Sequence, residues 1–296
     1  MGRHITYLLN PIAGTHGLRS LQPLIENLTR NRGIYFTIRP TDPQGRYAEL
    51  EAEIIAGNIT DVVVAGGDGT ISAVTSALRH TGVRFGIIPR GSGNGLAYAA
   101  GIPRDPVKAL DIIFSGKSAP VDGFMINARF SCMLSGIGFD ARVAHAFAKE
   151  KKRGLLTYAK VSASHFFRAE PYPFTITGAS GSIHTEAFFI SLANANQFGN
   201  QFTIAPKARL NDGLIDVVVV QRMNKLQLLI AVLHQLRYGD IREDIFRKKS
   251  ILYFQAEKLL IDNPSKAPLH IDGDPVGTSE RFEIQVVREA FRLLQP

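Results

Sequence analysis

Along the first 120 residues, short apolar runs alternate with segments whose apolar residues recur every three or four positions. The apolar runs predict strands at residues 5–10, 35–38, 62–65 and 85–88. The segments with the longer period predict helices at residues 18–30, 47–56, 71–78 and 105–114. Alternating strands and helices are typical of a doubly wound, Rossmann-like domain with a parallel sheet, in which ligands bind beyond the carboxyl ends of the strands. We therefore expect an α/β domain over residues 1–120.

The pattern changes after Pro120. Alternating polarity and short apolar runs, separated by turn residues, predict β-strands over most of residues 121–284. Segments with helical spacing interrupt or follow them at residues 141–167, 225–237 and 288–294. This part of the chain is expected to form an all-β domain, an antiparallel β-sandwich.

Two of the predicted strands end in glycine-rich turns. These turns are Gly66-Gly67-Asp68-Gly69-Thr70 and Pro89-Arg90-Gly91-Ser92-Gly93-Asn94-Gly95. A helix N-terminus attracts anions, and glycines let the backbone approach an anion closely. A carboxylate such as Asp68 is tolerated beside a polyphosphate when Mg²⁺ intervenes or when it takes a proton from a substrate. The pair of turns indicates phosphoryl transfer, whereas one such turn alone is equally compatible with a plain strand-to-helix connection capped by Asp68.

The two turns resemble the catalytic domain of the diacylglycerol kinase and sphingosine kinase superfamily, as does the segment Asn10-Pro11-Ile12-Ala13-Gly14. Gly95 departs from the pattern, because the superfamily often has an aspartate there. The resemblance covers nearly the whole chain and implies a lipid kinase that binds ATP between an α/β domain and a β domain. It also implies that residues 285–296 pack back on the first domain. The first glycine motif is less specific, since NAD kinases and phosphofructokinases share it.

The nucleotide site implied by this resemblance combines both turns with the ends of neighbouring strands. Its expected members are Asn10, Thr41, Gly66, Gly67, Asp68, Gly69, Thr70, Gly91, Ser92 and Asn94. The glycine N–H groups are expected to hold phosphates, and the polar side chains to bind phosphates or to fix the loops. The chain has no Walker lysine, so Mg²⁺ and an arginine such as Arg90 must neutralise the phosphate charge.

A second metal is implied by Asp212-Gly213-Leu214-Ile215-Asp216, which resembles a segment that binds a structural Mg²⁺ in bacterial members of the superfamily. Acids on either side of a turn can supply the hard oxygen ligands that Mg²⁺ prefers. Carried over to this chain, the ligands would be the Asp212 carboxylate and the carbonyl groups of Leu214 and Arg209. The same residues also carry a hairpin-turn signal, Asn-Asp-Gly, and the two interpretations are compatible.

The catalytic base is implied by His270-Ile271-Asp272-Gly273-Asp274-Pro275, which resembles the last motif of the superfamily. There the final acid is proposed to deprotonate the acceptor hydroxyl, so Asp274 is expected to be the base and Asp68 to face Mg²⁺–ATP, with a share in the base role left open for Asp68. A plain β-turn is the alternative interpretation of this motif. Two weaker matches to the superfamily lie at residues 136–140 and 194–201.

Composition and charge limit the kinds of partner that we expect the protein to bind. The net charge is +8, which favours an anionic partner, and no nucleic-acid-binding signature is present. We therefore expect a lipid substrate met at a membrane surface through two basic segments, 149–153 and 247–249. No apolar run is long enough to span a membrane, and the single cysteine, Cys132, suits a reducing compartment. We expect a cytoplasmic protein that associates peripherally with membranes, and a homodimer is compatible with these features.

Two other functions are also compatible with the sequence. A NAD kinase would be expected to carry an Asn-Glu pair soon after the first glycine motif, where this chain has Ile71-Ser72-Ala73-Val74. A non-catalytic nucleotide- or lipid-binding homologue is kept open by departures from the superfamily pattern at Gly95, Asn200 and Asp274.

Overall fold

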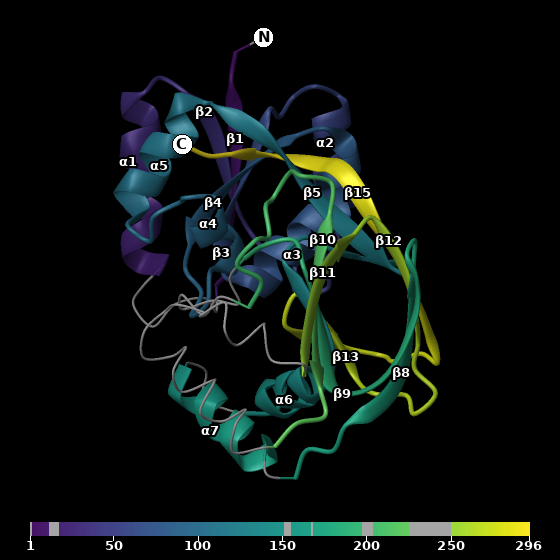
Figure 1. Cartoon of the computed structure of the whole chain (residues 1–296). Helices are drawn as coiled ribbons and strands as arrows, with labels where there is room; N and C mark the ends of the chain where they lie inside the picture. The colour runs from purple at the N-terminus through teal and green to yellow at the C-terminus, as the bar shows by residue number, and fades with distance from the viewer. Residues whose placement is uncertain (1, 12–17, 151–154, 167, 197–203, 225–249) are drawn as a thin grey trace. The chain divides into compact units, whose positions relative to one another are not determined.

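The computed structural model describes residues 2–11, 18–150, 155–166, 168–196, 204–224 and 250–296. The chain divides into two compact units, Met1–Val121 with Glu289–Pro296, and Asp122–Arg288 (Figure 1). Outside the described residues lie the expected helix at 225–237, most of the basic segments at 149–153 and 247–249, and parts of the motifs at 10–14 and 194–201.

The first unit alternates strands and helices. In chain order it contains β1 (His4–Leu9), α1 (Leu18–Asn31), β2 (Tyr35–Pro40), α2 (Ala48–Ile55), β3 (Asp61–Gly66), α3 (Asp68–Leu78), the 3₁₀ turn η1 (Arg79–Thr81), β4 (Arg84–Pro89), α4 (Gly95–Ala99), α5 (Pro106–Ser115) and the start of β5 (Ser118–Ile126). Strands β4, β3, β1 and β2 lie side by side in that order and are all parallel. The expected parallel α/β architecture is thus confirmed.

Alternation along the strands gives this sheet two buried faces. On one face, α1 and α5 pack over the sheet with Ile25 and Leu110 against Tyr7 and Val63. Val62 and Val64 are also buried and point the other way, toward the face where α2 and α3 lie in Figure 1. Burial on both faces explains why β3 is a continuous apolar run.

The second unit is mostly antiparallel strands. It contains the end of β5, β6 (Arg129–Ser131), β7 (Leu134–Gly138), α6 (Phe139–Ala148), α7 (Leu155–Phe166), β8 (Tyr172–Gly178), β9 (Gly181–Ala193), β10 (Ile215–Gln221), β11 (Ile251–Ala256), β12 (Lys258–Asp262), β13 (Leu269–Ile271), β14 (Asp274–Val276) and most of β15 (Arg281–Leu294). The pairing order β14-β13-β7-β9-β8-β12-β15 is antiparallel throughout. The expected β domain is confirmed, and the described residues of the expected helical insertion at 141–167 include helices α6 and α7. None of the helices in the described part of the chain is long and apolar enough to cross a membrane.

One secondary-structure prediction was wrong. The segment 288–294 is the end of strand β15 and not a helix, and it pairs in parallel with β4 through Arg292 and Leu293. Glu289 has a φ of 48°, which interrupts the alternation and leaves the adjacent residues Ala290 and Phe291 both buried. Two adjacent buried positions break the period of two, which is why the pattern resembled a helix. Residues 289–296 belong to the first unit.

Candidate functional site

The two glycine-rich turns are neighbours at one edge of the parallel sheet. Strands β3 and β4 pair in register up to Gly66 and Pro89, and the Arg90 N–H then donates to the Gly66 carbonyl at 2.9 Å. Beyond this point both chains leave the sheet at its carboxyl edge, where ligands of doubly wound domains bind. The sequence therefore placed the two turns together correctly.

The turns approach each other more closely than side chains would allow. A Cβ atom built on Gly91 would lie 2.6 Å from the Gly67 Cα, and one built on Gly67 would lie 3.0 Å from the Gly91 Cα. A Cβ on Gly66 would lie 2.8 Å from the Cβ of Thr70. These distances require glycine at all three positions, and the result is a cradle made of bare backbone.

Helix α3 begins inside this cradle. Its N-cap is Gly67, which has no side chain to cap the first turn, and Asp68 and Gly69 are its first residues. The N–H groups of a first helical turn have no partner within the helix, so they are suited to bind an anion. Asp68 lies in the same turn, half-buried, where its carboxylate would repel a bare phosphate. This combination fits a phosphate group that carries Mg²⁺.

Asn94 fixes the second turn. It is fully buried in the left-handed region with a φ of 57°, a conformation that asparagine tolerates better than most residues. Its Oδ1 accepts the Gly91 N–H at 2.8 Å, and its Nδ2 donates to the Gly91 carbonyl at 2.9 Å. Of the two roles expected for Asn94, it therefore fixes the loop. The Gly91 N–H is bound to Asn94 rather than directed to a phosphate, so Gly91 contributes close approach rather than a donor. Ser92 is exposed.

The residues that follow β1 and β2 lie at the same carboxyl edge of the sheet as the two turns. The Asn10 N–H donates to the Ala65 carbonyl at 3.0 Å, and its Nδ2 donates to the Thr70 hydroxyl at 2.7 Å. The structure thus brings Asn10 and Thr70 together, as expected. Thr41 is buried one strand further out, where its N–H donates to the Leu9 carbonyl at 3.0 Å.

The turn that was expected to hold a structural metal is shaped by its own hydrogen bonds. The Asp212 Oδ1 accepts the Leu214 N–H at 3.1 Å, and the Gly213 N–H donates to the Asp122 carboxylate at 2.7 Å. Gly213 has a φ of 73°, as a tight turn requires, but among the described strands β10 pairs with β9 and β11, so the turn does not join two paired strands and is not a β-hairpin. One carboxylate with nearby backbone carbonyl groups is a donor set that suits Mg²⁺ with several waters. The set formed by Asp212, Leu214 and Arg209 remains a prediction.

Asp216 does not share this role. It is fully buried on β10, where its carboxylate accepts hydrogen bonds from the Tyr253 hydroxyl and, at 3.2 Å, from Gln255 Nε2. Burial raises the pKa of the Asp216 carboxyl above its ordinary value, and burial together with this hydrogen bond raises the pKa of the Tyr253 hydroxyl. Of the two acids in the motif, only Asp212 is available to a metal at the turn.

Asp274 is the first residue of β14, directly after a two-residue turn. Asp272 and Gly273 form this turn with φ values of 49° and 88°, and Ile271 pairs with Asp274 across it. Asp-Gly is typical of such hairpins, so the turn interpretation holds. Asp274 itself is exposed.

The structural role of Asp272 was not predicted from the sequence. Its buried carboxylate accepts hydrogen bonds from the Ser131 hydroxyl at 2.6 Å and from the N–H groups of Met133 at 3.0 Å and Leu134 at 3.1 Å. The Cys132 N–H adds a fourth contact at 3.2 Å. The side chain thus anchors the turn to the loop between β6 and β7. The only signal in the sequence was the Asp-Gly pair, which predicts a turn but not the partner of its side chain.

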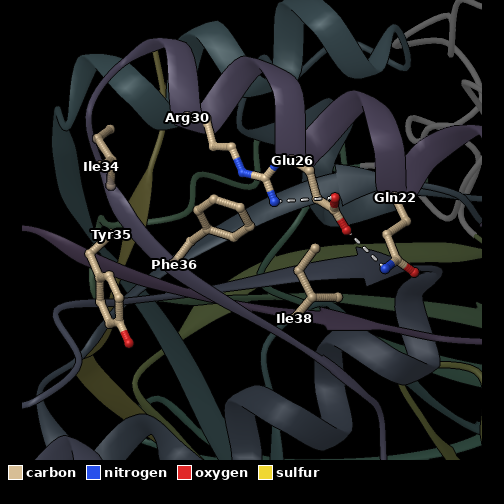
Figure 2. A pocket seen from close by; sticks show the side chains of 7 residues that line it. All are labelled: Gln22, Glu26, Arg30, Ile34, Tyr35, Phe36 and Ile38. Carbon is tan, nitrogen blue, oxygen red and sulfur yellow. Dashed lines mark hydrogen bonds and ion pairs between the residues drawn. The ribbon is translucent and has the colours of Figure 1, made fainter.

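A groove of about 550 Å³ lies elsewhere in the first unit, between α1 and β2. Figure 2 shows Gln22, Glu26 and Arg30 of α1 facing Phe36 and Ile38 of β2. The rim charges pair with each other, since Glu26 accepts from Gln22 at 3.0 Å and lies 3.7 Å from Arg30. This groove lacks the glycine backbone and the helix N-terminus of the cradle, which are the features expected of a phosphate site.

Two family models match this chain, and together they cover most of it. The family model "Diacylglycerol kinase catalytic domain" matches residues 4–126, and the model "YegS C-terminal NAD kinase beta sandwich-like domain" matches residues 134–295. A protein of Xanthomonas campestris named "Probable lipid kinase YegS-like" is 30% identical over 279 residues, which are 90% of this chain and 89% of that protein. A protein of the same name from Alcanivorax borkumensis is 26% identical over 95% of both chains.

Solved structures share the fold. A diacylglycerol kinase structure from Bacillus anthracis superposes with a TM-score of 0.77 at 19% identity, over 99% of this chain and 97% of that one. Another crystal structure from the same organism superposes with a TM-score of 0.84 at 21% identity, over 99% and 95% of the two chains.

Proposed function

We propose, from the premise that this chain belongs to the diacylglycerol kinase catalytic domain family and is a kinase, that it transfers the γ-phosphoryl group of ATP to the hydroxyl of a lipid alcohol. A diacylglycerol-like acceptor is the one proposed, because residues 4–126 match the model of the diacylglycerol kinase catalytic domain and relatives of the whole chain are named probable lipid kinases. The observation that carries the proposal is the backbone cradle at Gly67 and Gly91, which opens on the N-terminus of α3.

The residues of the first unit would bind the nucleotide. The N–H groups of the first turn of α3 would hold phosphate oxygens, and Asn94 and Asn10 would keep the turns in place through their bonds to Gly91 and Thr70. Asp68 would hold the Mg²⁺ that accompanies ATP, and this ion would neutralise charge on the transferring group. Catalysis of this kind depends on positioning and on charge stabilisation.

In the second unit, Asp274 would act as the base. The acceptor oxygen forms the new bond to the γ-phosphorus, and the bond from that phosphorus to the bridging oxygen of ADP breaks. The hydroxyl proton passes to the Asp274 carboxylate. Asp272 would hold the turn that carries this carboxylate through its contacts with Ser131 and Leu134.

The nucleotide site is tested by a single methyl group. Gly91→Ala should weaken ATP binding by at least about tenfold, because the added Cβ would lie 2.6 Å from Gly67. Gly178→Ala is the matched control, since a Cβ there meets nothing within 4 Å. Calorimetric titration with Mg²⁺–ATP measures both variants, with melting temperatures as a check on folding. Equal affinities for the folded variants would remove the cradle as the ATP site.

The acceptor is tested by transfer from radiolabelled ATP to a panel of lipid alcohols presented in mixed micelles, with NAD in parallel. Label in a lipid and none in NAD is the expected result. Label in NADP alone would replace the proposal with a NAD kinase activity.

A further inference from the structure

The motif at residues 136–140 has no part in the function described so far, yet it forms a buried polar contact in the second unit. Asp140, at the start of α6, lies with its Oδ2 3.4 Å from Nε2 of His270 on β13. The His270 side chain is fully buried, and 12% of the Asp140 side chain is exposed. The Ser191 hydroxyl donates to the same carboxylate oxygen at 3.4 Å. The imidazole and the carboxylate are thus close to each other in a largely buried environment, where their electrostatic interaction is stronger than it would be in water.

Gly136 makes room for this pair. It lies opposite His270 in the pairing of β7 with β13. A Cβ built on Gly136 would lie 1.8 Å from the Asp140 Oδ2 and 2.7 Å from the His270 Nε2. Any side chain at this position would therefore displace the pair. The first glycine of the motif and its final aspartate are thus two parts of one arrangement.

The other ring nitrogen of His270 reaches the turn that carries Asp274. Its Nδ1 accepts the N–H of Gly273, the second residue of the turn, at 3.2 Å. Because Nδ1 accepts, a neutral ring carries its proton on Nε2, which is the nitrogen that faces Asp140. The imidazole therefore connects α6 to the backbone immediately before Asp274.

Helix α6 holds β13 at a second point. The His145 Nε2 is 2.9 Å from the carbonyl oxygen of Leu269, the residue before His270. The helix also packs against β14. The two residues of the turn consequently have separate anchors. Asp272 is bound through its carboxylate to residues 131–134, and Gly273 is bound through its N–H to His270.

We propose that His270, oriented by Asp140, is a positioning residue that sets the backbone of the turn and thereby aims the Asp274 carboxylate at the acceptor hydroxyl. This inference rests on the proposed role of Asp274 as the base. Misplacing a reacting group by about 1 Å can cost on the order of a hundredfold in rate. A residue that acts in this way changes kcat without changing the affinity for ATP.

Two substitutions of His270 distinguish the contact of Nδ1 with Gly273 from the contact of Nε2 with Asp140. In His270→Asn the amide oxygen lies near the place of Nδ1 and can still accept the Gly273 N–H. In His270→Gln the amide lies near the place of Nε2 and keeps only the contact with Asp140. We expect His270→Gln to lower kcat by about 10- to 100-fold with an unchanged KM for ATP, and His270→Asn to retain several times more turnover. The matched control is His184→Gln on the exposed part of β9, which should change neither constant.

A double-mutant cycle with Asp274→Asn decides whether His270 acts through Asp274. If it does, His270→Gln should have little further effect once Asp274 is replaced, because the group that it positions is gone. A merely structural role would give equal losses in both backgrounds and would lower kcat equally in His270→Asn and His270→Gln. Either of those results overturns the inference.

Two further outcomes are distinguishable. If His270→Gln does not fold, Asp140→Asn enters the same cycle, because it keeps the shape of the side chain, and it should show the same lack of additivity. If Asp274→Asn alone retains full turnover, the proposed base is wrong and the inference about His270 is overturned with it. An additive cycle with an inactive Asp274→Asn overturns only the role of His270.

Discussion

In each of the two units, some residues matter because they have no side chain, and others because their side chains make hydrogen bonds. Gly67 and Gly91 bring two backbones into contact, and Gly136 leaves space for a buried carboxylate and an imidazole. Asn94 and Asp272 hold turns by hydrogen bonds to backbone N–H groups. Of the two acids proposed for chemistry, Asp68 is half-buried and Asp274 is exposed. This division predicts that changes at Asp68 and Asp274 affect turnover more than folding.

The first prediction concerns these two acids. Asp274→Asn should lower kcat by about 10²- to 10⁴-fold, as expected for loss of a general base, and should leave ATP affinity near normal. Asp274→Glu should keep measurable activity, because the longer side chain still ends in a carboxylate. Asp68→Asn should lose activity and also shift the Mg²⁺ dependence. Steady-state kinetics at several Mg²⁺ concentrations test all three variants. If Asp274→Asn turned over normally while Asp68→Asn was inactive with unchanged Mg²⁺ dependence, the base would be Asp68.

The second prediction concerns pH and Asp216. Its pKa is raised from 3.8 by burial, so the folded state binds a proton more readily than the unfolded state. The contribution of this group to the free energy of unfolding is therefore fully present below pH 3.8 and is lost as pH rises through the raised pKa. As pH rises from 3.8 through the raised pKa, the free energy of unfolding of wild type should therefore fall relative to that of Asp216→Asn. Urea unfolding at a series of pH values measures it, and a pH-independent difference would contradict the assignment.

At the scale of elements, the sequence predicted what depends on local periodicity and missed what depends on partners. The strands β1 to β4 and their helices follow from apolar spacing, and the two glycine turns follow from their position after strands. The end of β15 was mistaken for a helix because the irregular backbone at Glu289 puts two buried residues in succession. Short helix α4 was not expected, since its five residues are too few for a helical period to show. The anchoring of the Asp272 turn was also invisible, because its partners lie about 140 residues away.

The third prediction concerns the turn before β10. If Asp212 binds a structural Mg²⁺, the ion stabilises the folded state by mass action. Asp212→Ala should then lower the melting temperature more in Mg²⁺ than in EDTA. The matched control is Asp262→Ala on β12, whose carboxylate pairs with Arg281 at 2.8 Å and should respond equally in both buffers. A wild-type melting temperature that is the same with and without Mg²⁺ would exclude the metal.

At the scale of the whole molecule, the net charge of +8 bears on how a lipid substrate is reached. Basic proteins are attracted to anionic membrane surfaces over distances of about a Debye length, and salt screens this attraction. The fourth prediction is that binding to vesicles rises with the fraction of anionic lipid and falls with salt. Sedimentation with vesicles of phosphatidylcholine, with and without phosphatidylglycerol, measures it. Equal binding to both compositions at low salt would show that charge does not direct the protein to membranes.

We propose that the cradle at the carboxyl edge of the parallel sheet and the turn of Asp274 serve one reaction, transfer of a phosphoryl group to a lipid alcohol. The most direct measurement is the identity of the product formed from γ-labelled ATP and diacylglycerol, read by thin-layer chromatography and mass spectrometry. We expect a labelled lipid phosphomonoester with wild type and its near absence with Asp274→Asn and Gly91→Ala. Labelled inorganic phosphate as the only product, with every lipid alcohol in the panel unmodified, would contradict it.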